Sequence, residues 1–124
     1  MKHIVIYGRV PSKKNSKSII YNKKTGRPFI VSSKNHAEWH KDALIQIAGK
    51  RIGLVPKVER IELLFFPPDN HKADLTNKSE SVMDVLVDAG VLMDDNWFVV
   101  PSVKADFGGK DAENPRVDIS IYDV

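Results

Sequence analysis

Residues 58–66 read V-E-R-I-E-L-L-F-F and form the longest apolar strand candidate of the chain. Pro67 and Pro68 end this candidate, because proline cannot donate a hydrogen bond to a β-ladder. The last four residues, 63–66, are apolar on both faces of a strand, which is typical of a strand that has neighbours on both sides. The stretch therefore predicts a central strand of a β-sheet.

The segments on either side of this strand alternate between strand-like and helix-like patterns. Short β-branched and aromatic runs predict further strands at residues 2–8, 18–21, 28–31, 97–107 and 116–122. The strands at 18–21 and 28–31 are expected to form a hairpin. Apolar residues at three-and-four spacing predict two helices, one from Ser32 or Ser33 to about Lys50 and one over residues 77–89. This order predicts an α+β fold, in which a mixed β-sheet has two main helices packed on it.

Each predicted helix has one apolar face. The face of the first helix that is expected to be buried comprises Ala37, His40, Leu44 and Ile47. The corresponding face of the second helix comprises Val82, Val85, Leu86 and Ala89. Asn77 is a candidate N-cap of the second helix, with Glu80 as its capping-box partner.

The size and composition of the chain favour one intracellular domain over residues 1–124. The 124 residues are 42% hydrophobic, which suits a single core. No run of 18 apolar residues occurs and the first eight residues are too strand-like for a signal peptide, so no membrane partner is expected. Because the chain has no cysteine, any metal ion must be bound by oxygen or imidazole ligands.

The formal charge is divided unevenly along the chain. Residues 1–57 contain 13 Lys or Arg and two acids, a balance of +11, whereas residues 58–124 contain six Lys or Arg and 14 acids, a balance of −8. A basic half suits a polyanion such as DNA, and an acidic half suits divalent cations. Metal-assisted hydrolysis of a phosphodiester requires both properties. The alternative is that the basic residues form an ordinary solvated surface.

Seven carboxylates surround the second predicted helix: Asp69, Asp74, Glu80, Asp84, Asp88, Asp94 and Asp95. Neighbouring carboxylates repel one another unless a cation or a proton neutralises them, so the group indicates a metal site with oxygen ligands. Each acid also has a structural alternative. Asp74 is a candidate cap, Asp88 is expected to be a surface acid, and Asp94 and Asp95 suit an Asx turn.

Four short motifs occur in order over this region, D-L-x-N, D-x-L, A-G and D-D, at residues 74–77, 84–86, 89–90 and 94–95. Together they resemble the RusA family of Holliday-junction resolvases of phages and prophages, and the Pro-Ser-Lys-Lys-Asn loop at residues 11–15 and the Trp-containing first helix extend the resemblance. It implies a homodimeric, Mg²⁺-dependent endonuclease in the bacterial cytoplasm that makes paired nicks in four-way DNA junctions, with Mn²⁺ as a possible substitute. The essential acids of the family correspond to Asp74 and Asp95, with Asp94 beside the latter.

The chain departs from this family pattern at two positions. Thr76 stands where the family has a second aspartate, and Glu80 stands where it has a lysine. We therefore expect Glu80 to replace the missing ligand and Lys72 or Lys78 to supply the positive charge. The expected catalytic residues are then Asp74, Glu80, Asp94, Asp95, Lys72 and Lys78. The expected Mg²⁺ ligands are Asp74, Glu80, Asp84, Asp94 and Asp95.

The residues expected to contact DNA phosphates are Lys13, Lys14, Lys17, His71 and Lys72. Two other functions fit the same pattern: a DNA-binding protein that lacks catalysis, and a metal-dependent nuclease for RNA or for other branched DNA. His36 and His40 have the spacing of zinc ligands, but no third ligand accompanies them. Trp39 and Trp97 are expected to lie in the core or in a dimer interface.

Overall fold

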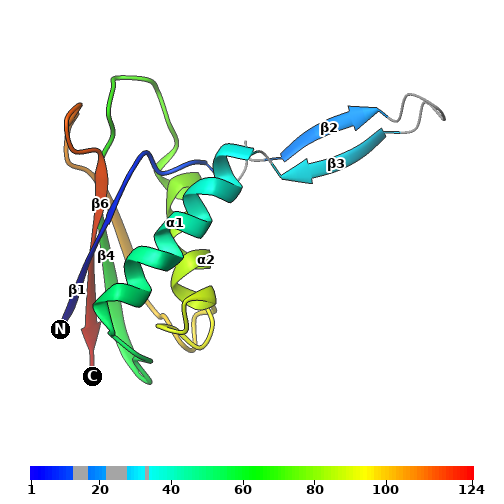
Figure 1. Cartoon of the computed structure of the whole chain (residues 1–124). Coiled ribbons are helices and arrows are strands. Elements are labelled where there is room, and N and C mark those ends of the chain that lie inside the picture. The colour runs from blue at the N-terminus through cyan, green and yellow to red at the C-terminus, as the bar shows by residue number, and fades with distance from the viewer. Residues whose placement is uncertain (13–16, 22–27, 33) are drawn as a thin grey trace.

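The computed structural model describes residues 1–12, 17–21, 28–32 and 34–124, and of residues 17–21, 28–32 and 34 it describes the backbone alone. The protein has the predicted α+β fold (Figure 1). Its elements, in chain order, are β1 (Lys2–Tyr7), β2 (Lys17–Tyr21), β3 (Pro28–Ser32), α1 (Lys34–Lys50), β4 (Val58–Phe66), α2 (Leu75–Asp88), β5 (Val103–Phe107) and β6 (Arg116–Asp123).

The main sheet is mixed and has the strand order β1-β6-β4-β5. β4 pairs with β6 in the antiparallel sense and with β5 in the parallel sense, while β6 also pairs antiparallel with β1. The prediction of a central strand at residues 58–66 is therefore confirmed. In β4 the side chains of Ile61, Leu63 and Phe65 are buried, whereas those of Leu64 and Phe66, on the other face, are half-buried.

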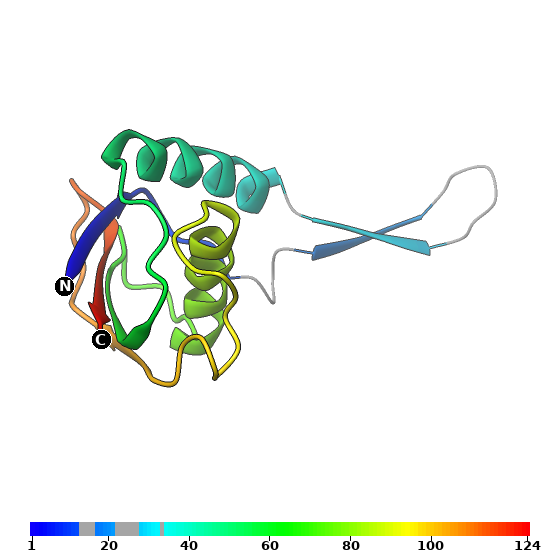
Figure 2. The ribbon, with the colours of Figure 1, turned by 90° about the horizontal axis from the view of Figure 1, so that it is seen from below.

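Both helices cover the same face of this sheet, as Figure 2 shows. The core between the layers combines the buried residues of the strands with Val82, Val85 and Leu86 of α2, as predicted for that helix. The buried residues of α1 are Trp39, Ala43 and Ile47. The predicted face of α1 was therefore only partly right, because Ala37 is exposed and His40 and Leu44 are half-buried. Trp39, the larger apolar side chain, takes the buried position beside the half-buried His40.

The starts of α2 and β5 differ from the prediction, and side-chain capping accounts for both differences. α2 begins at Leu75 because Asp74 is its N-cap: Asp74 Oδ1 accepts a hydrogen bond from the Thr76 N–H at 2.9 Å. Asn77 therefore lies inside the helix and is not the cap. The strand predicted to begin at residue 97 begins at Val103, because Asn96 Oδ1 accepts hydrogen bonds from the N–H groups of Phe98 and Val99 and holds residues 96–100 in a turn.

β2 and β3 form a separate two-stranded antiparallel sheet, which confirms the predicted hairpin. Figures 1 and 2 show that this hairpin projects from the body formed by the main sheet and the two helices. Lys17 is the first residue of β2. Lys13 and Lys14, which are expected to contact DNA, lie outside the described residues.

Candidate functional site

Four strand ends meet at one edge of the main sheet. β1, β4 and β5 all end at this edge and β6 begins there, because β4 runs parallel to β5 while β6 runs antiparallel to both β4 and β1. Arg116 pairs with Tyr7 on one side and with Phe66 on the other, and Phe107 pairs with Phe65. The loops that leave these strands, together with the first turn of α2, therefore surround a common space.

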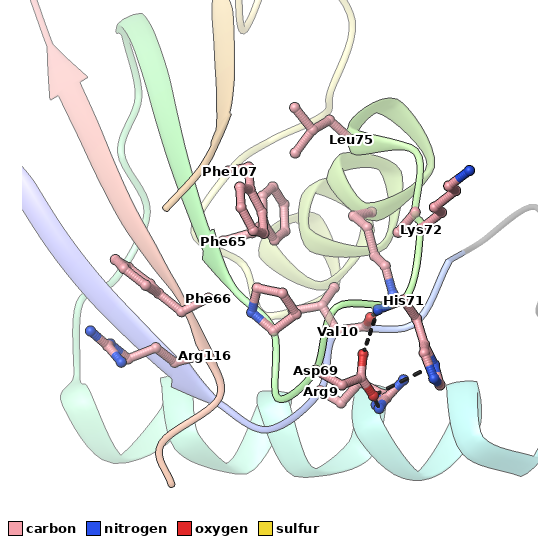
Figure 3. Close-up of a pocket in the computed structure, with 13 residues that line it drawn as sticks. Arg9, Val10, Phe65, Phe66, Asp69, His71, Lys72, Leu75, Phe107 and Arg116 are labelled. Carbon is pink, nitrogen blue, oxygen red and sulfur yellow. Dashed lines mark hydrogen bonds and ion pairs between the residues drawn. The ribbon is translucent and has the colours of Figure 1, made fainter. Parts of the chain in front are cut away.

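That space is a hollow of about 520 Å³ (Figure 3). Its lining comprises Arg9, Val10, Phe65, Phe66, Pro67, Asp69, His71, Lys72, Ala73, Leu75, Lys78, Phe107 and Arg116. The strand ends contribute the aromatic side chains of the lining, and the loop before α2 contributes three of its six ionisable groups, Asp69, His71 and Lys72. We call this the sheet-edge hollow.

The sheet-edge hollow carries five basic side chains against one carboxylate, that of Asp69. Asp69 forms ion pairs with Arg9 and with His71, whose Nδ1 lies 3.5 Å from Asp69 Oδ2. A hydrogen bond from the His71 N–H to Asp69 Oδ1, at 3.1 Å, lowers the pKa of Asp69, and the Arg9 guanidinium lowers it further. Asp69 is therefore ionised at neutral pH and offsets the charge of Arg9.

The positive charge of Arg116 is also balanced by two neighbouring carboxylates. Its Nη1 lies 2.7 Å from Asp111 Oδ2 and its Nε lies 3.5 Å from Asp118 Oδ1. Its guanidinium carbon lies 4.1 Å from the centre of the Phe66 ring, so the side chain holds that ring in place. The two lysines of the hollow, Lys72 and Lys78, therefore supply most of its uncompensated positive charge.

Lys78 is the more deeply placed of these two lysines. It is half-buried on the first turns of α2, and its Nζ donates a hydrogen bond to the carbonyl oxygen of Val10. Desolvation by burial lowers the pKa of Lys78, and the nearby charge of Arg9 lowers it further. Lys72, by contrast, is exposed on the loop before the helix.

A second hollow, of about 540 Å³, adjoins the first. It is lined by Ser12, Lys72, Ala73, Asp74, Asn77 and Lys78, and so shares Lys72, Ala73 and Lys78 with the sheet-edge hollow. The structure therefore brings together three of the predicted catalytic residues: Asp74, Lys72 and Lys78. His71, predicted to contact DNA, lies beside them and is exposed.

The remaining predicted acids lie along α2 or beyond its far end. Thr76 and Glu80 are four residues apart on the helix and therefore share one face, and both are exposed. Asp84 is half-buried one turn further on. Asp94 and Asp95 follow the C-terminal end of the helix, where the N–H of Leu92 is still bonded to the carbonyl oxygen of Leu86.

The side chain of Asp94 bonds locally, but the Asx turn of this segment is formed by Asn96, whose Oδ1 accepts the N–H of Phe98 two residues on. Asp94 Oδ1 accepts the N–H of Asp95 at 2.7 Å, and Asp94 Oδ2 accepts the side-chain amide of Asn96 at 2.9 Å. These bonds, the backbone N–H of Asp95 first, lower the pKa of Asp94. The Asp94 carboxylate is therefore ionised and has a fixed orientation, while the Asp95 side chain is exposed.

The acids predicted to bind Mg²⁺ lie at opposite ends of α2 and along it. The helix has 14 residues, a length of about 21 Å at 1.5 Å per residue. Asp74 caps one end and the turn with Asp94 and Asp95 follows the other. Within the described part of the chain, no three histidine or carboxylate side chains are grouped so that they could hold a metal ion. The predicted Mg²⁺ ligands are instead spread along α2 and the turn that follows it.

The other residues with candidate roles lie away from both hollows. Asp88 is exposed, as expected, and its Oδ2 lies 2.8 Å from His40 Nε2, so it links α2 to α1. The rings of His36 and His40 are stacked with their centres 6.0 Å apart. Trp39 is buried as predicted, but Trp97 is 75% exposed and is not part of the core.

Sequence reasoning missed Arg9, Phe66, Phe107 and Arg116 as lining residues of the site. These residues are distant in the sequence and share no motif. The signal that connects them is their position at the ends or beginnings of four strands, which the strand order brings to one edge of the sheet.

Comparison with protein-family models and with curated protein sequences finds no match for the chain. Within the described residues, no helix combines the length and the apolar character needed to cross a membrane.

Proposed function

We propose that the protein is a Mg²⁺-dependent endodeoxyribonuclease that resolves four-way DNA junctions by paired nicks. The observation that carries this proposal is the grouping of Asp74 with Lys72 and Lys78 where the two hollows adjoin. Ammonium groups bind phosphate, and a carboxylate beside a bound phosphodiester is the group that hydrolysis requires. The sequence motifs that resemble the RusA family run through the same helix.

In this proposal each side chain has a defined part. Lys72, which is exposed, meets the phosphate first, and Lys78, which is fixed by Val10, holds it beside Asp74. Asp74 serves both as the N-cap of α2, through Oδ1, and as a carboxylate of the reaction site. Glu80 shares a helix face with Thr76, so its carboxylate is placed to replace the acid missing at that position.

We propose further that the acids at the two ends of α2 act together through a homodimer. Met93, Trp97 and Phe98, beside Asp94 and Asp95, are 67%, 75% and 89% exposed. Aromatic and methionine side chains this exposed are typical of a surface that a partner covers. A second copy with α2 in the opposite direction would bring its Asp94 and Asp95 to Asp74, and the Mg²⁺ ion belongs where the acids of two chains meet.

The projecting hairpin is the proposed arm for binding the DNA backbone. Residues 13–27 contain six Lys or Arg, including Lys13, Lys14 and Lys17, and no acid. In the sequence, β2 lies within this basic segment and β3 follows it, and these two strands project from the body (Figure 1). A basic arm would contact phosphates beyond the cleavage site, with an affinity that falls as salt increases. Such an enzyme would act on DNA in the bacterial cytoplasm.

The test compares a synthetic four-way junction, a linear duplex and a single strand, each with Mg²⁺ and with EDTA. We expect symmetric nicks in the junction alone, which are lost in EDTA and in the variant Asp95→Asn. Asp88→Asn is the matched control, because Asp88 lies on the same helix but pairs with His40. Tight junction binding without cleavage would overturn the proposal in favour of a DNA-binding protein, and cleavage of RNA or duplex would indicate another nuclease.

A further inference from the structure

The sheet-edge hollow has an apolar wall that phosphate binding does not require. Phe65, Phe66 and Phe107 line it together with Val10, Pro67 and Leu75. DNA phosphates bind through basic side chains and backbone N–H groups, so aromatic rings add nothing to their affinity. A hollow that combines aromatic rings with ammonium groups suits a ligand with a flat apolar part and an anionic part.

Phe107 is the ring best placed to contact such a ligand. It is 61% exposed at the end of β5, whereas Phe65 is buried and Phe66 is half-buried beneath Arg116 (Figure 3). An exposed phenylalanine at the rim of a hollow gains stability when another flat apolar group covers it. Nucleobases do this regardless of their identity, because each base has a π-face.

The charges of the sheet-edge hollow limit the anionic part of the ligand to about one phosphate. Arg9 is paired with Asp69, and Arg116 is paired with Asp111 and Asp118. Lys72 and Lys78 remain, and they lie where this hollow meets the one that contains Asp74. The volume of about 520 Å³ is within the range of small-molecule sites, roughly 300–1,000 Å³, and is suited to a single nucleotide.

We propose that the sheet-edge hollow holds one unpaired nucleotide of the DNA, with its base against Phe107 and its phosphate on Lys72 and Lys78. This inference rests on the proposed function and adds a reason for structure selectivity. A base in a duplex is stacked and paired, so it enters such a hollow only after leaving the helix. This cost is lower where stacking is interrupted, at a branch point, and lowest where a base is already unpaired, at a bulge, so such DNA is bound preferentially.

The test measures binding in EDTA, so that it does not depend on cleavage. Three fluorescently labelled probes of equal length are compared by anisotropy: a duplex with one unpaired thymidine, the same duplex with an abasic site at that position, and a fully paired duplex. We expect the thymidine bulge to bind about tenfold more tightly than the abasic bulge, since stacking of one base on an aromatic ring contributes on this scale. Equal affinity for the two bulges would overturn the inference.

Two substitutions of Phe107 test whether this ring causes the preference for the thymidine bulge. Phe107→Ala is expected to remove the difference in affinity between the thymidine and abasic bulges, and Phe107→Leu is expected to retain part of that difference. Val103→Ala, at an exposed position of the same strand outside the hollow, is expected to leave the difference unchanged. A base preference that persists in Phe107→Ala would contradict the assignment. If the base preference holds but junctions are not cleaved, the proposed function alone fails; cleavage without a base preference contradicts this inference alone.

Discussion

The ammonium group of Lys78 donates a hydrogen bond to the carbonyl oxygen of Val10, which lies 68 residues earlier in the chain. One turn further along α2, Ser81 Oγ donates a hydrogen bond to the carbonyl oxygen of Pro11 at 2.7 Å. These two bonds fix the segment after β1 against the helix that carries Asp74. The shape of both hollows therefore depends on them.

Ser81→Ala is expected to destabilise the protein by about 1–3 kcal/mol, because the partly buried carbonyl oxygen of Pro11 loses its donor. Ser79→Ala is the matched control on the same helix: Ser79 is also buried, but its Oγ bonds to the carbonyl oxygen of Leu75 within the helix. We expect that control to change stability by less than about 0.5 kcal/mol, since alanine is the better helix former. Urea unfolding measures the loss of stability in each variant. Equal losses in the two would contradict the stabilising role of the Ser81–Pro11 hydrogen bond.

The lowered pKa of Lys78 predicts a specific dependence of stability on pH. Because burial lowers this pKa in the folded protein, Lys78 loses its proton at a lower pH when folded than when unfolded. Between those two values the unfolded chain binds more protons, so the contribution of Lys78 to folding becomes more favourable as the pH rises. Below that window the buried charge destabilises the fold.

The variant Lys78→Met isolates this effect, since it keeps most of the length of the side chain and removes its charge. The free energy of unfolding of wild type minus that of Lys78→Met should rise from pH 7.5 toward pH 10.5, the ordinary lysine value. Urea titrations at four pH values measure this difference. A difference that is flat or falls over the range would show that Lys78 is not desolvated in the folded protein.

Gly108 is expected to be essential for the aromatic wall of the sheet-edge hollow. A Cβ atom at this position would lie 2.6 Å from Cε1 and 2.8 Å from Cζ of the Phe66 ring, which also contacts Arg116. Gly108→Ala should therefore destabilise the protein by about 1–3 kcal/mol through overpacking. Gly49→Ala, in α1 with no atom near the added methyl group, should instead stabilise by up to about 1 kcal/mol. Thermal unfolding distinguishes the two, and a neutral Gly108→Ala would contradict the packing argument.

Asp74 is predicted to have two separable roles. Asp74→Asn keeps a side-chain oxygen that can accept the Thr76 N–H, so its stability should stay close to that of wild type. Asp74→Ala loses the cap and should be less stable by about 1 kcal/mol. Both variants should cleave junctions about 100-fold more slowly or worse, because the carboxylate proposed to bind Mg²⁺ is absent. Unfolding and cleavage assays on the same preparations test this; an active Asp74→Asn would assign Asp74 to capping alone.

The sequence predicted those parts of the fold that depend on local patterns. The bounds of β4 follow from an apolar run ended by two prolines, and the buried face of α2 follows from its periodicity. The predicted start of α2 was wrong. Asp74 and Asn77 are both good N-cap residues, and only the structure shows that Asp74 is the one whose side chain bonds to the backbone. In α1, periodicity placed His40 on the buried face, whereas its neighbour Trp39 is the buried residue and His40 is half-buried.

The candidate site was predictable only in part, for a topological reason. Asp74, Lys72 and Lys78 are close in sequence, so a motif can group them. Arg9, Phe66, Phe107 and Arg116 meet because β6 lies between β1 and β4, and no local pattern determines that strand order. The separation of Asp74 from Asp94 and Asp95 likewise requires the observed length of α2 and the bond that holds Leu92 at its end.

In the proposed dimer, acids from opposite ends of α2 act together at one junction-cleaving site, each contributed by a different chain. The most direct measurement is the cleavage of a four-way junction by a heterodimer of Asp74→Asn and Asp95→Asn, co-expressed with two different tags and purified through both. Such a dimer contains one site with both acids intact and one site with neither. We predict that each variant alone is inactive, that wild type makes paired nicks, and that the heterodimer nicks one strand per junction. A purified heterodimer as inactive as its parents, beside an active wild type, would contradict the account.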